Sequence, residues 1–225
     1  MSAAALAIAA LLLWAAPAAA QLERFTSVEA ASALRAALER GTQAAVATLG
    51  RPDGFLGDPR VRIPLPPALE RAERTLRRLG LGPQADELVL AMNRAAEAAV
   101  PHARQLFVDA VRRMSVQDAR DLLRGGATAA TAYFRRTTEE ELRRRFLPVV
   151  QQATAHLGVA QRYNRYAGTA AAFGLLDEEQ ASIDDYVTAR ALEGLFFMVA
   201  EEEKNIRKDP AGTGVAIIRR VFGSL

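Results

Sequence analysis

The sequence predicts an all-α fold: a bundle-like arrangement of helices with one long, ordered loop rich in proline and glycine and at most a short extended segment. Helix start and stop signals recur at short intervals along the chain. Between these signals, apolar residues repeat every three or four positions, which is the spacing of one helix face. Apolar residues stand at every second position, as in a strand, only in the stretch 61–65, and Pro64 and Pro66 exclude this stretch from the middle of a sheet.

The first helix is expected to begin at Thr26, which has capping-box spacing with Glu29, and to end at Gly50. After the loop, Pro67 suits the first position of the next helix. The remaining signals predict helices over 67–80, 84–100, 101–114, 115–124, 138–158, 161–174, 182–208 and 214–225.

Residues 1–20 carry no charged side chain. They contain an apolar run and end in the small residues Ala18 to Ala20. This pattern predicts a secretory signal peptide cleaved before Gln21, followed by a single helical domain over 21–225. An uncleaved anchor is the alternative, but the apolar run is shorter than the ~20 residues that a spanning helix needs. The chain has no cysteine, so we expect the exported protein to carry neither a lipidated cysteine nor disulfides.

The charges are balanced, with 29 basic and 26 acidic residues interleaved along the chain. Such a distribution gives no support for binding to nucleic acid. No segment after residue 20 has the length and apolarity of a membrane span.

Several long blocks resemble one family of bacterial exported proteins, domain-of-unknown-function family 4197. These blocks are "DGFLGDPRVRIPLP" (53–66), "ADELVLAMNRAAEAAVP" (85–101), "LFVDAVRRMSVQDARDLLRGG" (106–126), "TAYFRR" (131–136) and "LFFMVAEEEKNIRKDPAGTG" (195–214). The resemblance implies an exported, envelope-located bacterial protein with a helical domain, and together with the signal peptide it leads us to expect a periplasmic protein. It implies no activity, cofactor or catalytic residue.

Motifs of nucleophilic or metal catalysis are absent from the sequence. There is no G-x-S-x-G and no cysteine, and the two histidines, His102 and His156, are far apart. The glycine-rich stretches 125–131 and 209–215 lack the lysine of a P-loop. We therefore expect no cofactor and no metal site, and we lean against an enzyme.

Polar residues on apolar helix faces are the first candidate site. Asn93 and Glu97 share a face, and Glu202 falls on the apolar stripe of the helix 182–208. The two glutamates could face each other and hold a metal or share a proton, as carboxylates do in some helical bundles. The favoured alternative is a set of buried ion pairs, with Arg94, Arg207 or Arg136 neutralising the glutamates. This alternative predicts that Glu202 is buried beside an arginine.

The loop 51–67 is the second candidate site. Its prolines restrict the backbone, and Asp53 and Asp58 can bind nearby backbone N–H groups. The apolar pair Phe55 and Leu56 either plugs the helical domain, which is favoured, or projects as an anchor for a partner. The remaining candidate contact residues of this loop are Arg51, Arg60 and Arg62.

The function expected from these features is a non-catalytic cell-envelope protein that binds a partner or an apolar ligand through the loop 51–67. The alternative is a carboxylate-based metal-binding protein or enzyme that uses Glu97 and Glu202, assisted by Asp109, Arg94 and Tyr133. A purely structural or chaperone-like role is a third possibility.

Overall fold

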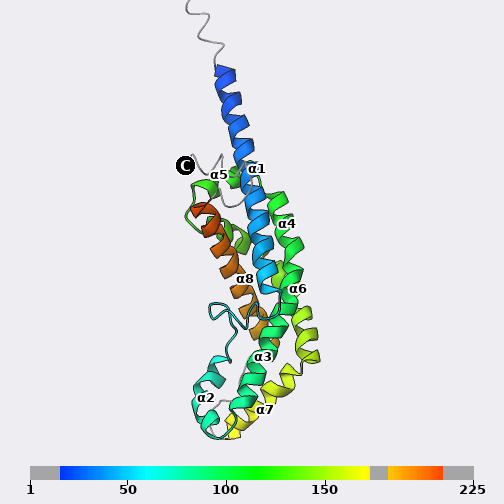
Figure 1. Ribbon diagram of the computed structural model, residues 1–225. Coiled ribbons are helices and arrows are strands. Elements are labelled where there is room, and N and C mark those ends of the chain that lie inside the picture. The colour runs from blue at the N-terminus through cyan, green and yellow to red at the C-terminus, as the bar shows by residue number, and fades with distance from the viewer. Residues whose placement is uncertain (1–15, 173–181, 210–225) are drawn as a thin grey trace, which may run out of the picture.

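The computed structural model describes residues 16–172 and 182–209, and this part of the chain is all-α, as predicted, without a strand (Figure 1). The helices are α1 (Ala16–Leu49), α2 (Pro67–Arg78), α3 (Gly82–Ala99), the short 3-10 helix η1 (Val100–His102), α4 (Ala103–Arg113), α5 (Val116–Arg124), α6 (Ala129–His156), α7 (Val159–Ala172) and α8 (Ile183–Lys208).

The long helices α1, α3, α6 and α8 form the body of the molecule. Helix α6 packs along α8, and α8 also packs against α1 and α3. The short helices α4 and α5 cover α1, whereas α2 and α7 lie together beside α3 at the opposite end of the molecule (Figure 1). The loop between α1 and α2 lies beside α8 and continues toward the end of the molecule that carries α2 (Figure 1).

The core is continuous along this body, and an aromatic cluster lies near its centre. The rings of Phe134 and Phe196 both meet the ring of Phe107 edge-on, with centroids 5.4 Å and 6.2 Å away. Edge-to-face pairs of this kind stabilise the fold by more than the burial of their apolar surface alone would. Three helices, α4, α6 and α8, are therefore held together at one point.

Most predicted helix boundaries agree with the structure within a few residues. Ser115 and Asp118 form a complete capping box at the start of α5, and Pro67 is the first residue of α2. Two expected starts are wrong. Helix α1 is already helical from Ala16, so Thr26 lies inside it, and α6 begins at Ala129 rather than near residue 138.

The start of α6 differs because its first turn is stabilised from another helix, as described below, and not by a local cap. The expected cleavage point after Ala20 falls inside α1, whereas residues 1–15 of the expected signal peptide lie outside the described part. The expected terminal helix over 214–225 also lies outside the described residues.

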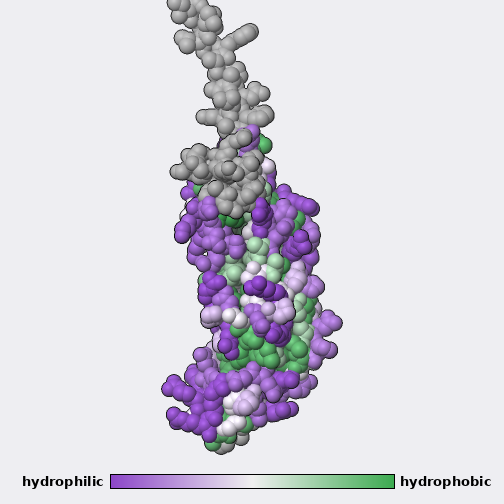
Figure 2. Space-filling model, viewed as in Figure 1, coloured by the Kyte–Doolittle hydropathy of each residue, from purple (hydrophilic) through white to green (hydrophobic). Residues whose placement is uncertain are grey.

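The visible face is mostly hydrophilic, with an apolar area over α3 (Figure 2). Leu90 of α3 is one of the exposed large apolar residues. Among the described helices, none combines the length and apolarity that a membrane span requires.

Candidate ligand pocket and the loop that frames it

The loop 51–67 begins with a tight turn against the end of α1. Gly54 has no side chain, and a Cβ atom there would lie 2.5 Å from the carbonyl oxygens of both Thr48 and Leu49. Backbone bonds then close successive turns, from Gly54 N–H to Arg51 C=O at 2.9 Å and from Gly57 N–H to Asp53 C=O at 3.0 Å. Asp53 has a positive φ of 63°, a conformation that aspartate adopts more readily than most residues.

Glu97 of α3 holds the apolar tip of this loop. Its Oε1 accepts hydrogen bonds from the backbone N–H groups of Phe55 at 3.1 Å and Leu56 at 3.3 Å. Its Oε2 accepts one from Arg94 at 2.6 Å, and Arg94 also binds Asp53 at 2.8 Å. The glutamate therefore supplies acceptors to buried backbone groups that have left the helical pattern.

Asn93 binds the second half of the loop in the same way. Its Oδ1 accepts from the N–H of Ile63, and its Nδ2 donates to the C=O of Ile63, both at 2.9 Å. Nδ2 also donates to the C=O of Val89, one turn earlier in α3. The side-chain amide thus replaces the neighbouring strand that the extended segment around Ile63 does not have.

Phe55 lies in the core, as the plug interpretation expects, with none of its surface exposed, and Leu56 is half-buried. The ring of Phe55 packs against Gly194 of α8, where a Cβ atom would approach Cε1 to 2.7 Å. Glycine at this position therefore creates the space for the ring. Further along the loop, Val61, Ile63 and Leu65 are also buried.

The loop ends against α8 as well. The hydroxyl of Tyr186 is shared between the carbonyl oxygens of Pro64 and Leu65, at 3.2 Å and 3.3 Å. Burial raises the pKa of this hydroxyl, so it stays protonated and remains a donor near neutral pH. The loop is consequently fixed to α1, α3 and α8, and its outer face is a defined surface.

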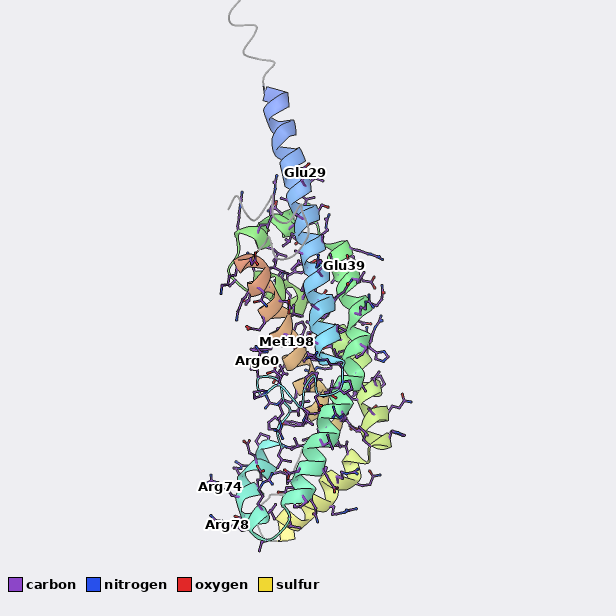
Figure 3. The ribbon with its side chains drawn as sticks, in the orientation of Figure 1. Glu29, Glu39, Arg60, Arg74, Arg78 and Met198 are labelled. Atoms are coloured by element: carbon purple, nitrogen blue, oxygen red, sulfur yellow. The ribbon has the colours of Figure 1, made fainter. Side chains whose placement is uncertain are left out.

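That outer face forms one wall of a pocket of about 560 Å³. The opposite walls are the first two turns of α6 and the middle of α8. The lining comprises Arg60, Val61, Arg62 and Pro64 of the loop, Thr128 just before α6, Thr131, Ala132 and Arg135 of α6, and Arg190, Glu193, Gly194, Phe196, Phe197 and Ala200 of α8. In Figure 3, Arg60 projects from the loop beside the part of α8 that carries Met198.

Arginine dominates the polar part of this lining, with four arginines against one glutamate. Arg135 lies over the ring of Phe196, 4.6 Å from its centroid, and Arg60 lies 5.7 Å from the centroid of Phe197. A guanidinium group over an aromatic face gains from the ring quadrupole and is held in place by it. The pocket therefore has cationic groups positioned over an apolar floor.

Arg60 is also oriented by two carboxylates. It forms an ion pair with Asp58 at 2.6 Å and approaches Glu201 to 3.8 Å. The hydrogen bond from Arg60 lowers the pKa of Asp58, which therefore stays ionised. Arg60 and Asp58 are both loop residues, so this pair fixes the arginine rather than the fold.

The buried carboxylate of α8 is Glu203, and the prediction of a buried Glu202 beside an arginine is wrong. Glu203 is 4% exposed and accepts from the N–H groups of Ala130 and Thr131 at 3.0 Å and 2.8 Å. It also pairs with Arg207 at 2.9 Å. Glu203 thereby caps the first turn of α6, where Thr128 provides no side-chain cap.

Glu202 itself is half-buried and lies against α1. A Cβ atom added to Gly41 of α1 would be 3.4 Å from the Cβ of Glu202. Burial, followed by the charge of Glu201, raises its pKa. No arginine or lysine of the described residues lies within ion-pair distance of it. The spacing in the sequence therefore assigns the buried carboxylate near the end of α8 to the residue before the correct one, Glu203.

The predicted residues therefore separate into two groups. Asn93, Arg94, Glu97, Asp53, Phe55 and Leu56 meet at the junction of α3 and the loop, whereas Arg60, with its partner Asp58, and Arg62 lie at the pocket. Glu202 belongs to neither group, because it lies against α1. Both oxygens of Glu97 are occupied by loop and arginine donors, and the described residues contain no group of three or more histidines or carboxylates placed to hold a metal. Asp109, proposed as an assistant in the enzyme alternative, binds Gln105 within α4.

Four important residues were missed in the sequence: Arg135, Arg190, Gly194 and Glu203. Gly194 could have been noticed, because a glycine inside a helix destabilises that helix and suggests that another group packs closely against it. The two arginines carried no such signal, since neither has a distinctive sequence context. Glu203 stands in a run of three glutamates, whose phases can be separated only when the helix axis is known.

Fold and pocket together define a class of protein, an all-α protein in which an immobilised loop forms one wall of an arginine-lined pocket. The family model described as "Protein of unknown function (DUF4197)" matches residues 24–223, and the chain belongs to this family. The resemblance seen in the sequence blocks is confirmed. Comparisons with curated proteins and with solved structures gave no match.

Proposed function

We propose that this protein is a non-catalytic binding protein of the bacterial cell envelope, exported by a signal peptide over residues 1–20. Its binding site is the pocket between the loop 51–67, α6 and α8, which takes a ligand or a segment of a partner protein. The observation that carries the proposal is the attachment of the loop to α3 and α8, because a wall fixed in advance lowers the entropic cost of binding.

The composition of the pocket also supports binding. Its volume lies in the range of about 300 to 1,000 Å³ that small-molecule sites occupy. Phe197, Pro64 and Ala132 provide accessible apolar surface, and the arginines provide a few directed polar groups. Such a combination is typical of ligand sites, where apolar contact gives affinity and polar groups give orientation.

The enzyme alternative has weaker support. Glu97 is saturated by hydrogen bonds from the loop and Arg94, which suits a structural carboxylate more than a general base. We therefore assign Glu97 to the support of the pocket wall.

The proposal is tested by filling the pocket. Ala132 is exposed and lines the pocket, so Ala132→Trp introduces bulk without disturbing the core, and Ala155→Trp places the same bulk on the exposed surface of α6 outside the pocket lining. Each protein is purified from the periplasm, and co-purifying small molecules and cross-linked proteins are identified by mass spectrometry. We expect a bound component with the wild type and Ala155→Trp that is lost with Ala132→Trp.

An equal recovery of every component with all three proteins would overturn the pocket as the binding site. Recovery of the protein only from the cytoplasm, with Met1 retained, would overturn export.

A further inference from the structure

We infer that the pocket binds an amphiphilic acid, a molecule with a carboxylate or phosphate group joined to an apolar body. The inference rests on the proposed function and adds the chemical class of the ligand. It follows from the position of the cationic groups relative to the aromatic floor of the pocket.

Two of the arginines make no side-chain hydrogen bond to a carboxylate of the described residues. Arg135 forms an i,i+4 ion pair with Glu139 on the surface, with 3.6 Å between Nη1 and Oε1, which is too long for a hydrogen bond. Arg62, on the opposite wall, has no carboxylate of the described residues within ion-pair distance. Because a guanidinium has five N–H donors in a planar fork, each of these residues can bind a carboxylate or phosphate through two of them.

Arg60 and Arg190 do have carboxylate partners, Asp58 and Glu193, but these pairs are on the surface. An exposed ion pair contributes little free energy, so an incoming anion can share its donors at small cost. Among the residues that line the pocket, four arginines therefore stand against one carboxylate, Glu193, and the other carboxylates that pair with them lie outside the lining.

The apolar requirement comes from the floor. Phe196 is buried beneath Arg135, and Phe197 lies partly exposed beneath Arg60. The accessible apolar surface of the pocket comes from Phe197, Ala132 and Ala200. A bare inorganic anion would leave this surface wet, whereas an aliphatic or aromatic body would cover it and displace the water.

The first experiment measures binding to the full chain by calorimetry at low salt. The probes are 4-phenylbutyrate, phenyl phosphate, the neutral analogue 4-phenylbutanol, and inorganic phosphate. We expect both organic acids to bind at least about tenfold more tightly than the alcohol, because each charge-assisted hydrogen bond is worth about one factor of ten or more. Inorganic phosphate should bind more weakly than phenyl phosphate, and the comparison of the two acids separates a carboxylate preference from a phosphate preference.

The second experiment locates the site with matched variants. Arg135→Gln and Arg62→Gln should each weaken binding of the acids about tenfold and bring them closer to the alcohol. Arg74→Gln removes the same charge from α2, where Arg74 projects from the end of the molecule distant from Arg60 (Figure 3), and should leave binding unchanged. Unfolding midpoints of all variants are measured alongside, and Arg135→Lys provides a second variant that keeps the charge but loses the fork.

The possible failures are distinguishable. If the acids and the alcohol bind equally, and Ala132→Trp abolishes both, the pocket is a binding site but the inference of an acid is overturned. If acids bind with affinities that neither Ala132→Trp nor Arg135→Gln alters, both the inference and the proposed site are overturned. If no probe binds although a component co-purifies in the pocket, the ligand class is wrong and the binding function stands.

Discussion

The side-chain amide of Asn93 binds both backbone groups of Ile63, with N–H to Oδ1 and Nδ2 to C=O distances of 2.9 Å. One residue of α3 thus satisfies a buried, extended segment that no strand accompanies in the described part of the chain. Replacing Asn93 with Ala would leave both groups of Ile63 without a partner. We expect Asn93→Ala to lower the free energy of unfolding by about 2 to 4 kcal/mol, since each buried unsatisfied group costs about 1 to 3 kcal/mol.

Urea unfolding followed by circular dichroism measures this change. Asn205→Ala, at an exposed position of α8, is the control and should alter stability by less than about 0.5 kcal/mol. An unchanged midpoint for Asn93→Ala would mean that the loop is not attached through this residue in solution.

Two neighbouring glutamates of α8 should behave differently. Glu203→Ala removes a buried carboxylate from Arg207 and from the first turn of α6, so we expect a loss of about 3 to 5 kcal/mol. Glu202→Ala removes a half-buried carboxylate without an ion-pair partner among the described residues and should cost less than about 1 kcal/mol. If Glu202→Ala lowered the unfolding midpoint more than Glu203→Ala, Glu202 and not Glu203 would be the buried carboxylate in solution.

The contact between Phe55 and Gly194 can be tested by a double-mutant cycle. Phe55→Ala should cost about 3 to 5 kcal/mol, the usual loss for a buried phenylalanine. Gly194→Ala should also destabilise, because the new methyl group would approach Cε1 of Phe55 to 2.7 Å. Combining Gly194→Ala with Phe55→Leu should cost less than the sum of the two single changes, since the smaller side chain relieves the clash. The cycle therefore uses Gly194→Ala, Phe55→Leu and their combination, and a loss of unfolding free energy in the double variant equal to the sum of the two single losses would show that the residues do not touch.

The raised pKa of Glu202 predicts that its neutral analogue, glutamine, makes the protein more stable, by an amount that depends on pH. Burial and the charge of Glu201 raise this pKa above the unfolded value of about 4.3. Between the two values the folded state holds more protons than the unfolded state, so stability falls as pH rises through that window. We expect Glu202→Gln to be more stable than the wild type at pH 7 and to lose this advantage below about pH 4.

Urea midpoints of both proteins at pH 3.5, 5.5 and 7 provide the comparison. A difference between them that stays the same at all three pH values would contradict the raised pKa.

Local signals in the sequence predicted most helices because those helices depend on local chemistry. The capping box of Ser115 and Asp118 is an example, since both partners lie within four residues. The start of α6 could not be predicted in this way, because its capping group, Glu203, follows more than seventy residues later. The pocket was only partly predictable for the same reason: Arg60 and Arg62 stand in an unusual loop, whereas Arg135 reaches the site only through the packing of α6 on α8.

The capping of α6 by Glu203 also has a consequence for synthesis. While the ribosome is still making α7, every residue of α6 has been added, but the acceptor for the N–H groups of Ala130 and Thr131 has not. The first turn of α6 therefore cannot reach its final state until α8 emerges, and this turn carries one wall of the pocket. A chain that stops before Glu203 would hold the loop and α3 yet lack a finished site, so ligand binding should require the last turns of α8.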